Sequence, residues 1–101
     1  MKTHSFEFKV ENMWAGNADI YEEDDGIYLA NLYIHPQYRN QGIATKVLEH
    51  LIKEYRVNTL VVAKDNEVAI NLYKKFGFVV EEEYFSDELK TNVYYMKRVG
   101  E

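Results

Sequence analysis

The sequence predicts a mixed α/β fold in which two helices pack on a sheet. Three observations indicate this class: alternating apolar residues near the N-terminus, an apolar run that ends in a glycine-bearing loop, and helical spacing of apolar residues after that loop. The predicted order of elements is β-β-β-α-β-α-β-β. Because 101 residues with 47% hydrophobic content suit one compact core, residues 1–101 are expected to form a single domain.

The N-terminal part is predicted to hold three strands. Apolar side chains alternate over residues 5–11, and residues 14–21 form a second, weaker strand candidate. Residues 22–26 combine an acidic run with a final glycine, which favours a turn. Residues 27–34 are apolar almost throughout, as in a strand covered on both faces, and Pro36 follows its end.

The rest of the chain is predicted to alternate between helices and strands. Apolar residues recur at helical spacing over 43–55, and a short buried strand follows at 59–63. Asn66 or Asp65 can cap a second helix, which ends at Gly77. Two final strands are expected over 78–85 and 92–99, joined by a polar turn.

The charge distribution restricts the class of partner. The net charge is −5, and acidic residues cluster at 22–25 and at 81–83. This balance argues against nucleic acid, which requires a basic face. It fits a cationic partner such as an amine, and it fits equally well two solvated turns or strand ends.

Composition also bears on metals, membranes and location. Cysteine is absent, which excludes disulfides and thiolate metal ligands, and no pair of histidines has metal-ligand spacing, so no metal is expected. The N-terminus lacks the features of a signal peptide, and no apolar run approaches the roughly 20 residues that cross a bilayer. A cytoplasmic protein without membrane contact is therefore expected.

The terminal strands offer edges at which a homodimer could form. In that arrangement Tyr94, Tyr95 and Met96 could face the second copy. Alternatively, these side chains pack inside the monomer.

The loop from Arg39 to Ala44 is the main candidate for chemistry. It joins a predicted buried strand to a predicted helix, and Gly42 allows an anion to approach the backbone N–H groups at the helix start. The alternative is an ordinary strand-to-helix loop. A nucleotide P-loop would need lysine and a hydroxyl residue after its last glycine, whereas Ile43 follows Gly42 here.

Two segments carry a resemblance to a known family. Residues 32–44 read as a strand, a proline and an R-x-x-G-x-A sequence that opens a helix. Residues 66–78 match N-x-x-A-x-x-x-Y-x-x-x-G-F. Together they resemble the acetyl-coenzyme A signature of the GNAT superfamily of N-acetyltransferases, over roughly residues 26–85. The resemblance implies the GNAT-like acyl-CoA N-acyltransferase fold, without the helices that usually precede the first hairpin.

The resemblance also implies a role for each matching residue. Backbone amides of the glycine loop would hold the coenzyme A pyrophosphate. The backbone of strand residues 32–34 would bind the pantetheine arm where this strand and the 59–63 strand splay apart. Asn66 would contact the same arm. Tyr73 would act as general acid to the leaving thiolate, although a core aromatic at this position is an equally simple interpretation. The implied cofactor-binding residues are Leu32, Tyr33, Ile34, Arg39, Gln41, Gly42, Ile43, Ala44, Thr45, Asn66 and Tyr73.

The expected activity is transfer of an acetyl group from acetyl-CoA to a primary amine of a small molecule, protein or peptide. No carboxylate lies on the two strands where the family often places its general base, so His35 or an acidic residue of the 22–25 run is the substitute to consider. The missing base and the short N-terminal region leave a second interpretation: an acyl-CoA-binding or regulatory module of the same fold that does not catalyse.

Overall fold

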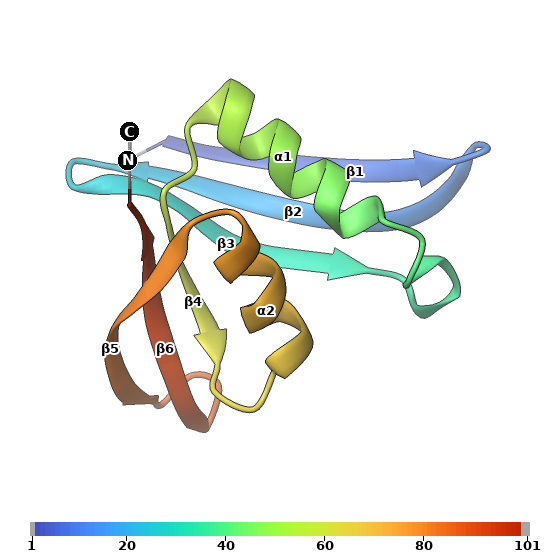
Figure 1. Cartoon of the computed structure of the whole chain (residues 1–101). Helices are drawn as coiled ribbons and strands as arrows, with labels where there is room; N and C mark the ends of the chain where they lie inside the picture. The colour runs from blue at the N-terminus through green and yellow to red at the C-terminus, as the bar shows by residue number, and fades with distance from the viewer. Residues whose placement is uncertain (1, 100–101) are drawn as a thin grey trace. The chain divides into compact units, whose positions relative to one another are not determined.

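The computed structural model describes residues 2–99 and confirms the predicted α/β class and order of elements, with one short helix added (Figure 1). The helices are η1 (Pro36–Tyr38, a 3-10 helix), α1 (Ile43–Tyr55) and α2 (Glu67–Lys75). The strands are β1 (Lys2–Val10), β2 (Met13–Glu23), β3 (Gly26–Ile34), β4 (Thr59–Ala63), β5 (Phe78–Ser86) and β6 (Thr91–Arg98).

Contacts within the chain divide it after Val57 into two compact units, each with its own antiparallel strands. In the first unit, β2 lies between β1 and β3 and pairs with both. Helix α1 lies across one face of these three strands (Figure 1). In the second unit, β6 lies between β4 and β5, and α2 precedes β5.

The covered face of the first unit is identified by the contacts of Tyr55 on α1. Its ring lies 5.0 Å from the Phe6 ring and 5.5 Å from the His4 ring, both on β1. The strand partners of these residues, Ala18 and Ile20 of β2, are fully buried. Because side chains alternate along a strand, this face forms the core and the intervening residues point away from it.

The core of the second unit is built around strands β4 and β6. Leu60, Val93 and Met96 are buried, as is Phe78 at the start of β5. Met96 is 0% exposed, so the expectation that it faces a second copy is wrong. Tyr94 and Tyr95 are half-buried.

The N-terminal hairpin is longer than the sequence pattern indicated. The predicted strand 14–21 extends to the bounds of β2. The predicted strand 5–11 begins earlier, at Lys2, and ends at Val10, because Glu11 lies with Asn12 in the connecting turn, both with positive φ. A two-residue turn with positive φ at both residues matches the twist of the paired strands. Pairing continues from this turn along the whole hairpin and includes polar residues such as Thr3.

Smaller differences concern the next turn and the strand after it. The turn after β2 consists of Asp24 and Asp25, and Gly26 already pairs with Glu23 as part of β3. The prediction that 27–34 is covered on both faces is wrong, because Tyr33 is 41% exposed. In the part of the chain that the structure describes, neither α1 nor α2 is long and apolar enough to span a membrane.

Candidate functional site

The glycine loop is held in place by backbone hydrogen bonds on both sides of η1. The His35 N–H donates to the Ala15 carbonyl oxygen of β2 at 2.7 Å. The Tyr38 N–H then donates to the His35 carbonyl oxygen at 2.8 Å. The proline that ends β3 also starts η1, since its fixed φ suits the first turn of a helix. The loop therefore leaves β3 in a defined direction and delivers the chain to the start of α1.

Helix α1 begins at Gly42 without a side chain that caps it. Gly42 has φ +77°, and no side-chain hydrogen bond satisfies the first turn. That turn contains no acidic residue, and the first helical hydrogen bond runs from the Lys46 N–H to the Gly42 carbonyl oxygen. The N–H groups of Ile43, Ala44 and Thr45 therefore point out of the positive end of the helix dipole.

Open space lies above this helix start. A Cβ atom built on Gly42 would meet no atom within 4 Å. The preceding Asn40 also has a left-handed backbone, with φ +64°. Unpaired N–H groups, a helix dipole and unobstructed access are the properties of an anion site, so the loop can bind a phosphate or diphosphate.

Arg39 links the loop back to β3. Its Nε donates to the Ile34 carbonyl oxygen at 2.8 Å, and its guanidinium lies 5.5 Å from the centre of the Tyr33 ring. The terminal nitrogens of the guanidinium carry further donors that an anion can use. The Gln41 side chain donates to the Gln37 carbonyl oxygen at 3.2 Å. Arg39 therefore has a structural role in addition to any contact with an anion.

Aromatic side chains cluster around Tyr33 and His35, and Trp14 among them is not a residue that the sequence pattern singles out. The Trp14 ring stacks on Tyr33 with centroids 6.0 Å apart and meets His35 edge-on at 6.1 Å. The Tyr38 ring also meets the His35 ring edge-on, with centroids 6.2 Å apart. No local pattern indicates Trp14 here, because the contact depends on the register between β2 and β3.

His35 is a poor candidate for the general base. Its Nδ1 accepts a hydrogen bond from the Gln37 N–H at 3.1 Å, which caps η1. A neutral imidazole that accepts at Nδ1 carries its proton on Nε2, so neither nitrogen is free to take a proton from an amine. The hydrogen bond thus assigns His35 to holding the loop.

Gly16 explains how β2 and β3 approach each other beside the loop. A Cβ atom on Gly16 would lie 2.1 Å from the Tyr33 carbonyl oxygen, which is inside van der Waals contact. Only glycine permits this separation at the strand end that presents Tyr33 and Ile34. A glycine within a strand pattern is the sequence signal for such an approach.

Asn66 and Tyr73 belong to the second unit. The Asn66 side-chain oxygen accepts a hydrogen bond from the Ala69 N–H at 3.2 Å, so Asn66 caps α2 and the alternative cap, Asp65, is not used. The amide nitrogen at the exposed end of the same side chain is still a donor.

Tyr73 is a core residue of α2. It is 8% exposed, and its ring meets the Phe78 ring edge-on at 6.0 Å. Burial removes water from the phenol and raises the pKa of Tyr73 to about 12. The side chain therefore keeps its proton throughout the physiological pH range.

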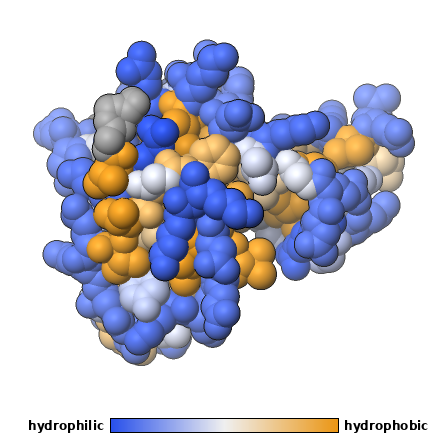
Figure 2. All heavy atoms as spheres, viewed as in Figure 1, coloured by the Kyte–Doolittle hydropathy of each residue, from blue (hydrophilic) through white to orange (hydrophobic). Residues whose placement is uncertain are grey.

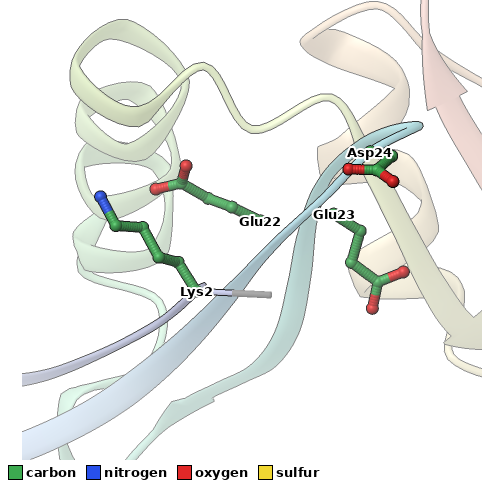
Figure 3. Close-up of a pocket in the computed structure, with 4 residues that line it drawn as sticks. All are labelled: Lys2, Glu22, Glu23 and Asp24. Atoms are coloured by element: carbon green, nitrogen blue, oxygen red, sulfur yellow. The ribbon is translucent and has the colours of Figure 1, made fainter.

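The acidic residues of the β2–β3 turn lie away from the glycine loop. Lys2, Glu22, Glu23 and Asp24 line a hollow of about 310 Å³ (Figure 3). The Glu22 carboxylate also accepts a hydrogen bond from the His4 ring at 2.6 Å. The Glu23–Gly26 pair lies eight residues from Ile34 along β3, which is about 26 Å of strand. Within residues 2–99, no group of histidine and carboxylate side chains is arranged to hold a metal ion.

Curated relatives match about half of this chain. It is 44% identical over 57 residues to the human cysteine-rich protein 2-binding protein, covering 54% of the chain and 7% of that protein. It is 40% identical over 57 residues to mouse thialysine N-epsilon-acetyltransferase, covering 50% of the chain and 33% of the enzyme. The chain thus spans a third or less of these two relatives.

Solved structures and a family model match more of the chain. The ribosomal-protein-S18-alanine N-acetyltransferase of Escherichia coli superposes with a TM-score of 0.78 and 28% identity, covering 98% of this chain and 72% of the enzyme. The model of the GNAT acetyltransferase family matches residues 4–78, which include the glycine loop and all of α2. The chain therefore belongs to the GNAT family of acetyltransferases.

Proposed function

We propose that this protein transfers an acetyl group from acetyl-CoA to a primary amine of a small molecule, a protein or a peptide. The observation that carries the proposal is the start of α1 at Gly42, where unpaired N–H groups face open space. Family membership and relatives named as N-acetyltransferases support the same reaction.

The proposed cofactor contacts begin at the glycine loop. Backbone N–H groups from Gln41 to Thr45 bind the pyrophosphate, and the terminal nitrogens of Arg39 add positive charge. The backbone of residues 32–34 binds the amides of the pantetheine arm in the manner of an added strand. The Asn66 amide nitrogen donates to the same arm, because its oxygen is already used to cap α2.

The proposed reaction needs little chemistry from the protein. The neutral amine nitrogen attacks the thioester carbonyl carbon, the carbon–sulfur bond breaks, the amine loses a proton and the sulfur gains one. Positioning supplies much of the acceleration, since a thioester is already activated. Tyr73 is proposed as the general acid that gives its proton to the sulfur, and the proton released by the amine passes to water, from which the phenolate regains a proton.

Burial of Tyr73 bears on how well it can serve as an acid. With a pKa of about 12, the phenol is always protonated and available to donate. Transfer of this proton to a thiolate whose thiol has a pKa of about 8.5 is uphill, so Tyr73 is a weak acid for this step. This same burial is the observation that favours the second candidate, a module that binds acyl-CoA without turnover.

Thiol release from acetyl-CoA distinguishes the two candidates. We expect release with at least one member of a panel that contains a polyamine, a lysine analogue and a peptide with a free α-amine. The Tyr73→Phe variant should bind coenzyme A normally and lose kcat by about 10- to 100-fold. Binding of acetyl-CoA with no release by any amine would support the non-catalytic module, and unchanged kcat in the variant would remove Tyr73 from the mechanism.

A further inference from the structure

Strand β5 is exposed along nearly its whole length. On one side it pairs with β6, and no strand in the described residues pairs with its other side. Every residue from Val79 to Phe85 is exposed. The outer side therefore presents main-chain N–H and C=O groups that another extended chain can pair with.

The side chains of β5 form an ordered pattern along this edge. Val79 and Val80 lie at one end and Tyr84 and Phe85 at the other, with Phe85 57% exposed. Apolar residues gather over β5 on the left of Figure 2. Three consecutive glutamates, 81–83, separate the two apolar pairs. The edge thus offers apolar contacts at both ends and negative charge in the middle.

This pattern disfavours pairing with a second copy of the same strand. In an antiparallel pair centred on Glu82, Glu81 of one copy would lie opposite Glu83 of the other. Like charges placed directly opposite each other destabilise paired strands.

The same carboxylates suit a strand that carries lysine or arginine. The chain itself provides an example, because the Lys64 ammonium donates to the Glu83 carboxylate at 2.9 Å. That hydrogen bond raises the pKa of Lys64 above its ordinary value. Glu81 and Glu82 form no ion pair within residues 2–99, and both residues are exposed.

We propose that the outer edge of β5 is a docking site for a partner polypeptide, bound as an added strand, with basic residues opposite Glu81–Glu83 and apolar residues at either end. Backbone hydrogen bonds supply affinity in this mode, and the glutamates select the partner by charge. The site goes beyond the acetyl-transfer proposal and does not depend on it.

The test uses the whole chain, without acetyl-CoA, and three synthetic peptides with blocked ends. The probe has three lysines flanked by valine and tyrosine residues. One control replaces the lysines with glutamates, and the other keeps the probe sequence but is N-methylated at alternate residues. We expect the probe alone to shift the amide resonances of residues 79–85. N-methylation should weaken binding at least about tenfold, because it removes backbone donors.

Two glutamate-to-lysine variants distinguish binding at the β5 edge from a non-specific effect of the protein's net charge. Glu82→Lys on β5 should weaken probe binding about tenfold or more, whereas Glu88→Lys, in the exposed turn after β5, should change it less than about threefold. Equal effects of the two variants, or equal binding of the methylated peptide, would overturn the proposal. Sedimentation of the chain without peptide tests whether a second copy of the chain binds at this edge instead. A dimer that becomes more stable in the Glu82→Lys variant would show that the edge binds a second copy.

Discussion

At the scale of single residues, Gly42 makes the clearest prediction. Alanine there must adopt φ +77°, and its Cβ would enter the space where an anion approaches the helix start. We expect Gly42→Ala to lower stability by about 1 kcal/mol and acetyl-CoA affinity by at least about tenfold, measured by calorimetry.

Gly77→Ala is the matched control for this substitution. Gly77 also has a left-handed backbone, with φ +93°, and a Cβ there would lie 3.6 Å from its nearest neighbour. It lies beyond the end of α2 and is not part of the glycine loop. A similar loss of stability with normal affinity is expected, and a comparable loss of affinity in both variants would show that strain, not anion access, is the cause.

The buried Tyr73 predicts a pH dependence of stability. Its folded-state pKa of about 12 lies above the ordinary value of 10.0, so the folded protein holds this proton more tightly than the unfolded chain. The contribution is complete below pH 10 and is lost as pH rises to about 12, with an upper limit of about 2.7 kcal/mol.

Denaturant titrations between pH 9 and pH 11.5 measure this contribution. The free energy of unfolding should fall less steeply with pH in Tyr73→Phe than in the unmodified protein. Tyr84→Phe, which changes a tyrosine that is 45% exposed, should keep the original slope. A slope that is the same in all three proteins would show that Tyr73 is solvated.

At the scale of elements, β2 and β3 are predicted to depend on Gly16. A Cβ 2.1 Å from the Tyr33 carbonyl oxygen cannot be accommodated without separating the strands. Gly16→Ala should therefore lower the free energy of unfolding by more than about 2 kcal/mol, measured by chemical denaturation. Retained stability would mean that the strands separate at little cost at this point.

Strand β4 contains a site where a substitution should stabilise the protein. Thr59 is fully buried, and its hydroxyl has no hydrogen-bond partner among residues 2–99. Thr59→Val replaces the hydroxyl with a methyl group of similar size and should raise stability by about 1 kcal/mol. Thr59→Ser keeps the hydroxyl and loses the methyl group, so it should destabilise. A less stable valine variant would show that the hydroxyl has a partner.

The elements that could be predicted from the sequence are those set by local pattern. Helix 43–55 matches α1 at both ends, because apolar spacing and Gly42 act within the same few residues. Strand ends in the first hairpin were missed, since pairing across the Glu11–Asn12 turn extends β1 beyond its alternating apolar residues. The contact of Trp14 with Tyr33 depends on register between strands, which no local pattern specifies.

At the scale of the whole molecule, the two units carry different parts of the proposed function. The first holds the glycine loop with Arg39 and the backbone of β3, and the second holds Asn66 and Tyr73. The sequence motifs predict a role for both sets of residues. They did not reveal that Tyr73 is buried or that His35 is engaged by η1, because both facts depend on packing.

Titration with acetyl-CoA, followed through the backbone amide resonances, tests the central claim most directly. The account predicts saturable shifts of residues 41–45 at the start of α1, together with shifts along residues 32–34 of β3. Free phosphate at the same concentration should move the first group far less. Resonances of 41–45 that stay unmoved while acetyl-CoA is in large excess would contradict the account.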